Sequence, residues 1–201
     1  MARFLKLISN ILIHGFFVYG CSSQSQRVPT DIPTVDLTPL TSVILYSDEI
    51  NASDFLKVDE GLEIADRSDC WSMDCAFNVW DIIQQEPLAF TDPNASLELA
   101  ISLIRFQTPE DAISSAVRIS GNAGQPGFRF IVIPAKTLSE HSFAYAEDGR
   151  YVLLVTVYEN IQISISISEY TWKIHEPEKA GTFLANVAKM QIDKLMLSNE
   201  R

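Results

Sequence analysis

The sequence predicts an α+β fold: an antiparallel sheet of about five strands, with a helix after the first clear strand and a long C-terminal helix packed on one face. Three observations lead to this prediction. Segments of alternating apolar and polar residues, typical of half-buried strands, recur from residue 96 onward. Short turns separate several of them, and short connections force neighbouring strands to run antiparallel. The last segment, residues 176–197, has apolar residues at helical spacing.

Residues 96–106 form the first clear strand, because apolar side chains occupy every second position. The following Thr-Pro-Glu-Asp at 108–111 begins a helix, since Thr caps its N-terminus, Pro suits the first helical position and the acids complement the helix dipole. The glycine-rich segment 121–127 ends it. We expect the apolar stripe of this helix to contain Ala112, Ile113, Ala116 and Val117.

Four further strands are expected at residues 128–133, 142–147, 151–158 and 161–168. Turns at Asp148-Gly149 and Glu159-Asn160 separate the last three. The third of the four is apolar on both faces, which predicts a central strand covered on both sides. The fourth alternates isoleucine with Gln and Ser, so that one face packs a core and the other is small and polar. We expect both helices to lie on one face of the sheet.

The N-terminal half is harder to interpret. Residues 42–46 are consistent with a strand, and residues 76–83 with either a short helix or a buried strand. Two tryptophans, Trp71 and Trp80, flank a pair of cysteines. Core packing over that pair is the simpler interpretation, and an aromatic platform for a ligand is the alternative.

Composition limits the class of protein. The chain has 201 residues, 47% of them hydrophobic and 20% charged, with a formal net charge of −11. These values suit one compact domain with an appendage and exclude disorder throughout. Nucleic acid is not an expected partner, because 15 basic residues face 26 acidic ones and a phosphate backbone demands a positive footprint.

The N-terminus has the features of an export signal. Arg3 and Lys6 precede a mostly apolar stretch from Leu7 to Val18, which is too short for a membrane span but fits a secretory signal. The next residues are Val18-Tyr19-Gly20-Cys21. This motif resembles the lipobox of bacterial lipoproteins, although Tyr19 is bulkier than is usual there. The resemblance covers residues 1–21 and implies a signal peptide at 1–20 and lipidation of Cys21.

Residues 21–34 then predict a lipidated cysteine followed by a flexible tether, because the segment is polar and contains two prolines. Residues 35–201 are expected to form a single α+β domain. Loss of residues 1–20 leaves 13 basic residues against 26 acidic ones, a net charge of −13. The strand-rich meander finished by a helix resembles, in pattern alone, small extracytoplasmic lipoprotein domains of unassigned function.

The other two cysteines, Cys70 and Cys75, are expected to form a disulfide outside the cytoplasm. Closing so short a loop contributes roughly 2 kcal/mol if the geometry is unstrained. A metal site is not expected, because the spacing is unusual and no second Cys or His cluster follows. A redox-active pair is also not expected, since the motif is not Cys-x-x-Cys.

Acidic residues concentrate between positions 48 and 86. Eleven acids face Lys57 and Arg67 in this segment. A cation site or a docking face for a basic partner is one interpretation, and a solvated surface is the simpler one. No EF-hand pattern is present. The acids are Asp48, Glu49, Asp54, Asp59, Glu60, Glu63, Asp66, Asp69, Asp74, Asp81 and Glu86.

No standard catalytic motif occurs in the sequence, and no cofactor is expected. Gly121, Gly124 and Gly127 do not make a dinucleotide fingerprint, because they follow a helix and precede a strand. After removal of the signal the histidines are His141 and His175, each at an element boundary. We therefore expect a non-catalytic binding or scaffolding module, lipid-anchored in the cell membrane or outer membrane and facing outside the cytoplasm. A carrier of an apolar ligand is the alternative, and a hydrolase using either histidine is a third hypothesis.

Overall fold

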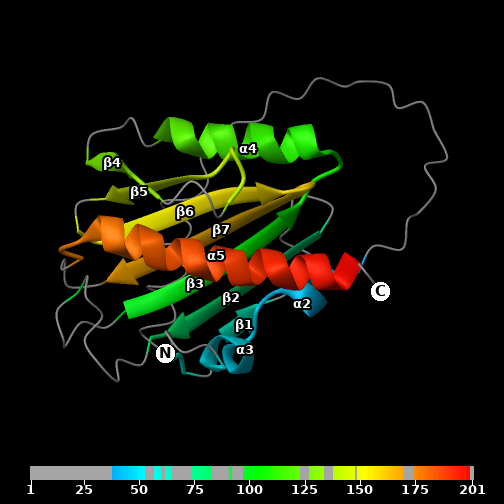
Figure 1. Ribbon diagram of the computed structural model, residues 1–201, viewed down its shortest axis with the longest axis horizontal. Helices are drawn as coiled ribbons and strands as arrows, with labels where there is room; N and C mark the ends of the chain where they lie inside the picture. The colour runs from blue at the N-terminus through cyan, green and yellow to red at the C-terminus, as the bar shows by residue number, and fades with distance from the viewer. Residues whose placement is uncertain are drawn as a thin grey trace. The chain divides into compact units, whose positions relative to one another are not determined.

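The computed structural model describes residues 38–52, 57–59, 62–64, 74–82, 91, 97–122, 127–133, 138–147, 149–169 and 174–199. All of them belong to one compact unit, Leu37–Arg201. Two short helices come first, followed by strands, a central helix, more strands and a long terminal helix (Figure 1). The elements are α2 (Leu40–Val43), α3 (Ser47–Asn51), β1 (Leu62–Ile64), β2 (Asp74–Asp81), β3 (Leu97–Arg105), α4 (Pro109–Asn122), β4 (Phe128–Ile131), β5 (Phe143–Glu147), β6 (Tyr151–Tyr158), β7 (Ile161–Glu169) and α5 (Pro177–Asn199).

The described strands form one antiparallel sheet in the order β1-β2-β3-β7-β6-β5-β4. The predicted α+β class is therefore confirmed, with seven strands in place of about five. The two extra strands are β1, which was not predicted, and β2, which resolves the open question at residues 76–83 in favour of a strand. Every neighbouring pair is antiparallel, and β3 pairs with β7 along its whole length, from Leu97 opposite Glu169 to Arg105 opposite Ile161.

The long helix α5 covers one face of the sheet (Figure 1). The isoleucines at 163, 165 and 167 on β7 are fully buried in the same cluster as Leu184 and Val187 of α5. The apolar side predicted for this helix is confirmed at every position: Ala180, Phe183, Leu184, Val187, Ala188, Gln191 and Leu195 are buried. Because these side chains occupy the space between α5 and the sheet, this layer is an ordinary packed core.

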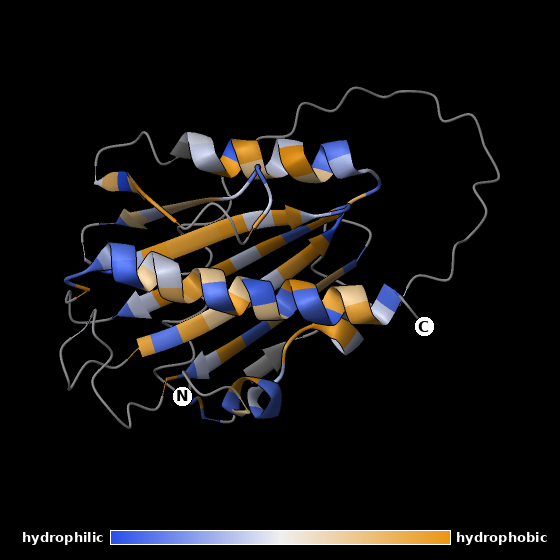
Figure 2. Ribbon diagram, viewed as in Figure 1, coloured by the Kyte–Doolittle hydropathy of each residue, from blue (hydrophilic) through white to orange (hydrophobic). Residues whose placement is uncertain are grey.

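The second helix, α4, packs on the opposite face, so the expectation that both helices share one face is wrong. Ala112 and Ala116 of α4 cluster with Leu153, Val155 and Val157 of β6. The alternate β6 residues Val152 and Leu154 belong to the α5 cluster. Strand β6 is apolar along its length (Figure 2), and a strand that is apolar on both faces needs cover on both.

Two details of the expected elements also differ from the structure. Val117 was placed in the apolar stripe of α4, but it is 59% exposed, because it lies about 100° around the helix from the buried Ala116. Residues 42–46 do not form a strand. They end α2 and lead into α3, and the backbone N–H of Leu45 is bonded by the side chain of Gln191 in place of a strand partner.

The predicted N-cap of α4 is confirmed. The hydroxyl oxygen of Thr108 accepts a hydrogen bond from the Asp111 N–H at 3.1 Å and donates to the Asp111 carboxylate at 2.9 Å. We expect Thr108→Ala to lower the free energy of unfolding by about 1 kcal/mol, because one N–H of the first turn loses its partner. Chemical denaturation measures this change, with Thr108→Ser as the control that keeps the cap. Equal stability of the two variants would show that the cap contributes nothing.

Candidate functional site

The predicted lipidation and disulfide residues are only partly within the described chain. Cys21 and Cys70 lie outside the described residues. Cys75 is half-buried on β2 and is disulfide-bonded. The pairing of Cys75 with Cys70 and the lipidation of Cys21 therefore stay predictions.

Two acids of the 48–86 segment have structural partners. Asp74 is buried on β2, and its Oδ2 lies 3.3 Å from Nη1 of Arg105 on β3, with both side chains under a tenth exposed. The same oxygen accepts a hydrogen bond from the N–H of Leu40 at 2.8 Å. Glu49 forms an ion pair with Lys194 of α5. Among the residues that the structure describes, no group of three His, Cys, Asp or Glu side chains is placed to hold a metal ion.

The two histidines lie at the surface. His175 is exposed just before α5, and His141 is partly exposed beside Glu140, with 3.6 Å between Nε2 and the carboxylate oxygen. Each stands at an element boundary, as the sequence indicated. Neither histidine is buried.

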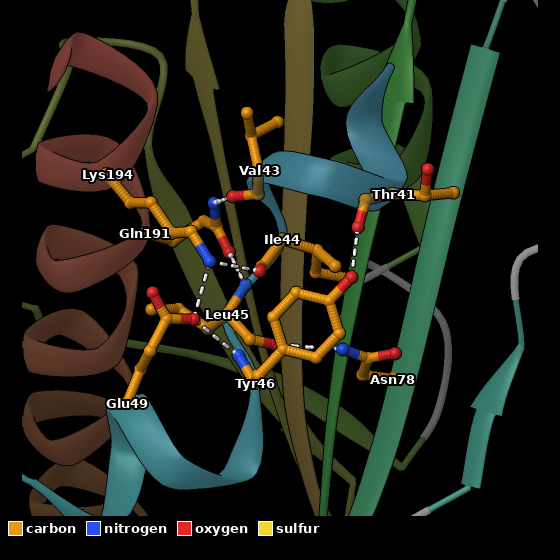
Figure 3. Close-up of polar contacts among 9 residues, drawn as sticks. All are labelled: Thr41, Val43, Ile44, Leu45, Tyr46, Glu49, Asn78, Gln191 and Lys194. Atoms are coloured by element: carbon orange, nitrogen blue, oxygen red, sulfur yellow. Dashed lines mark hydrogen bonds and ion pairs between the residues drawn. The ribbon is translucent and has the colours of Figure 1, made fainter. Parts of the chain in front are cut away.

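A network of polar contacts holds the α2–α3 segment against α5 (Figure 3). Gln191 is fully buried in the middle of α5. Its Oε1 accepts a hydrogen bond from the N–H of Leu45, and its Nε2 donates to the carbonyl of Val43, both at 2.8 Å. From the sheet side, Nδ2 of Asn78 donates to the carbonyl of Leu45 at 2.8 Å. These contacts satisfy backbone groups that have no strand or helix partner.

The outer part of this network is ionic. The ammonium of Lys194 contacts the Glu49 carboxylate, donates to the carbonyl of Ile44 at 2.7 Å and lies 4.9 Å from the centre of the Tyr46 ring. Glu49 also accepts from the N–H of Tyr46 at 2.8 Å. We call residues 38–51 with their partners on β2, β3 and α5 the N-terminal clamp. Its role is structural, because these hydrogen bonds and the ion pair join the α2–α3 segment to the sheet and to α5.

The opposite edge of the sheet exposes apolar side chains. Strand β4 ends the sheet, and two apolar side chains at this edge are exposed: Phe130 by 57% and Val132 by 84%. The neighbouring Ile131 is buried against α5. We call Phe130, Val132, Ile133 and the backbone of β4 the β4 rim. Exposed apolar residues grouped on an edge strand are unusual, because an open edge invites pairing.

Aromatic rings support the rim on the α4 side of the sheet. The ring of Phe130 meets that of Phe143 edge to face with 6.4 Å between centroids, and Phe143 stacks on Tyr145 at 6.4 Å. Phe128 meets Tyr145 edge to face at 5.4 Å. Such pairs are worth about 0.5–1.5 kcal/mol each beyond the burial of their area. They hold Phe130 in place even though more than half of it is exposed.

A shallow groove adjoins the rim on the α5 side. It has a volume of about 340 Å³ and is lined by Val132, Ile133, Glu178, Lys179 and Thr182. At its margin, Nη1 of Arg129 lies 2.6 Å from a carboxylate oxygen of Glu178, with both side chains about half exposed. The groove is therefore mainly apolar at its floor and charged at its margin.

Sequence reasoning identified residues 128–133 as a strand but missed their role as an exposed edge. A signal was present, because Pro134 follows directly and proline is confined to edge strands or strand ends. That signal alone does not separate an edge strand from any strand that ends at a proline. Only the order of the strands in the sheet shows that β4 lies at an edge.

Burial within the aromatic cluster raises the pKa of Tyr145 to about 12, and the nearby charge of Glu147 adds to the rise. An unperturbed tyrosine has a pKa of about 10. Between these values the folded protein keeps a proton that the unfolded chain loses, so stability falls as pH rises through this interval.

We expect this loss to be smaller in Tyr145→Phe, which has no hydroxyl at that position to titrate. Urea denaturation of both proteins across the alkaline interval measures the difference. An identical pH dependence in the two proteins would show that Tyr145 titrates normally.

Comparison with known proteins adds little. No family model and no curated protein matches the chain. One solved structure, the extracellular domain of PknH from Mycobacterium tuberculosis, aligns over 80% of this chain and 95% of its own, with 13% identity and a TM-score of 0.43. A likeness this weak defines neither a shared fold nor a shared function. Among the described helices, none combines the length and the apolar character needed to cross a membrane.

Proposed function

We propose that the protein is a lipid-anchored module outside the cytoplasm that binds a partner at the β4 rim and catalyses no reaction. The observation that carries the proposal is the exposed apolar pair formed by Phe130, on the edge strand β4, and Val132, just after it. Isolated exposed apolar residues need no explanation, but a group of them beside an apolar groove is typical of an interaction surface.

The rim lies across the sheet from the N-terminal clamp, which contacts β2 and β3. The chain enters the domain at the N-terminal clamp, where the carbonyl of Thr38 accepts a hydrogen bond from Nη2 of Arg105 at 2.9 Å. From β3, which carries Arg105, the sheet continues through β7, β6 and β5 to β4. Four strand spacings of about 4.8 Å place the rim roughly 19 Å across the sheet from that contact.

The absence of catalysis is proposed from the surroundings of the histidines. His141 and His175 lie at the surface, Cys75 is disulfide-bonded, and Asp74 and Glu49 are ion-paired within the fold. If turnover of any substrate in a broad hydrolase panel fell in the double variant His141→Ala/His175→Ala, the non-catalytic proposal would be wrong.

Anchoring is tested at Cys21. We expect Cys21→Ser to incorporate no labelled palmitate and to accumulate at precursor length, as the unaltered protein does under globomycin. Ser22→Ala, the neighbouring change, keeps the thiol and is expected to be processed normally. Unchanged processing and membrane fractionation of Cys21→Ser would contradict the lipid anchor.

Binding at the rim is tested by crosslinking in the living cell. A photoreactive benzophenone amino acid placed at Val132 is expected to give a discrete adduct. The same group at Val117, which is exposed on α4, is the matched control. Equal adduct yields at the two positions would show that the rim has no particular partner.

A further inference from the structure

We propose that the partner bound at the β4 rim is an extended, basic segment of another protein, which adds to the sheet as a strand beyond β4. This inference rests on the proposed function and specifies both the class of partner and the mode of binding. Strand addition at an open sheet edge is a general way of recognising peptides, in which the main chain supplies affinity and alternate side chains supply specificity.

The backbone of β4 provides the first part of the complementarity. On one side β4 pairs with β5 through Phe128–Glu147, Arg129–Ala146, Phe130–Tyr145 and Ile131–Ala144. On its other side no described strand follows. An edge strand presents a row of N–H and C=O groups at fixed spacing, and the ligand that matches such a row is another extended polypeptide.

Side chains provide the second part. Phe130 projects on the aromatic side of the sheet, where it meets Phe143, while Ile131 is buried on the α5 side beside the groove. An added strand has its own side chains on alternate faces, so apolar residues at every second position would lie on the side of Phe130. The rim therefore specifies both the chemistry of the partner's apolar residues and their spacing along the added strand.

A second copy of this chain fits the rim less well than a short segment does. A stable interface needs about 20–30 residues on each side. Strand β4 has four residues, and five line the groove beside it. Two copies would also bring together two chains, each of formal charge −13 after loss of residues 1–20. That charge attracts a basic segment and repels both another copy and an anionic lipid surface.

The experiment uses the full-length protein purified in detergent and a synthetic heptapeptide of alternating lysine and valine. Hydrogen exchange of the amides of residues 128–132 is followed as the peptide is added. An analogue with N-methyl groups on alternate residues keeps the side chains but lacks the donors that a strand needs. We expect the unmodified peptide to protect the β4 amides and the methylated analogue to bind at least about tenfold more weakly.

Variants connect binding to the rim. Phe130→Ala and, separately, Val132→Ala are expected to weaken peptide binding by about tenfold, the loss typical of an apolar anchor at an interface. Val117→Ala is the matched control, because Val117 is exposed by 59% and Phe130 by 57%, and we expect it to change binding by less than about twofold. Since Phe130 contacts Phe143 and its loss also affects folding, the more exposed Val132 gives the independent measurement.

Four results would overturn the proposal. The first is that millimolar peptide gives the β4 amides no protection, and the second is that the methylated analogue binds as tightly as the unmodified peptide. The third is protection that rises with protein concentration alone, as a dimer forms. The fourth is protection by phospholipid vesicles in the absence of peptide. The third identifies a second copy as the occupant and the fourth a lipid surface. None depends on Cys21, so failure of strand addition and failure of the lipid anchor are distinguished.

Discussion

Replacing Asp74 with alanine is expected to lower the free energy of unfolding by about 3–5 kcal/mol. The change leaves the guanidinium of Arg105 buried without its carboxylate, and it removes the acceptor of the Leu40 N–H. Burial lowers the pKa of Arg105 and the charge of Asp74 opposes that effect, so the carboxylate compensates directly for the desolvation of the guanidinium. Urea denaturation followed by circular dichroism measures the loss.

An exposed pair of the same chemistry provides the control. Arg129 and Glu178 are about half exposed, and we expect Arg129→Ala to cost about 1 kcal/mol or less. Replacing both Asp74 and Arg105 by leucine should recover part of the loss, because no uncompensated charge then remains buried. A cost for Asp74→Ala no larger than that for Arg129→Ala would mean that water reaches the buried pair.

Replacing Gln191 with leucine is expected to cost about 2–4 kcal/mol, even though leucine is apolar and the site is buried in a helix. The amide of Gln191 bonds the N–H of Leu45 and the carbonyl of Val43, and leucine leaves both buried groups without a partner. In a domain of this size the loss corresponds to a fall of several degrees in Tm, at about 2–4 °C per kcal/mol.

The same helix supplies the control. Lys189 and Asp193 form an exposed ion pair one helical turn apart, and Lys189→Ala should cost about 0.5 kcal/mol or less. Gln191→Glu keeps an acceptor for the Leu45 N–H but loses the donor to the Val43 carbonyl. Comparing its free energy of unfolding with that of Gln191→Leu is expected to separate the contributions of the two hydrogen bonds. If Gln191→Leu were as stable as the unaltered protein, the N-terminal clamp would not depend on this amide.

These two predictions concern contacts that the sequence does not reveal. Gln191 was placed on the apolar side of the last helix, which is correct, but its partners are 146 and 148 positions away. Asp74 was counted among a run of surface acids, yet it is buried opposite Arg105. In both cases the role of a polar residue depends on which backbone groups and charges folding brings beside it.

The elements that the sequence predicted well have strong local signals. The alternation of residues 96–106 needs no partner to be recognised as a half-buried strand, and β3 shows that alternation in its burial. Thr108 caps α4 through atoms three residues away. The buried side of α5 follows from helical spacing alone. In each case the physical cause operates within one helix or one strand.

Where those signals were short or absent, tertiary packing decided the outcome. Val43, Ile44 and Leu45 are buried by α5 and the sheet, and so short an apolar run carries no period that separates strand from helix. The face on which α4 packs was not readable from α4 itself. It follows from β6, whose two apolar faces each require cover.

By itself, the sequence determined the α+β class, most of the strands, both main helices and the pattern that predicts an exported lipoprotein. The tertiary structure alone decided the order of the strands, the opposite faces of α4 and α5, and the position of β4 at the edge with Phe130 and Val132 exposed. The physical reason is the separation along the chain over which each effect acts. Propensity, capping and periodicity act between near neighbours in the chain, whereas exposure at a sheet edge depends on which strand folding leaves without a partner.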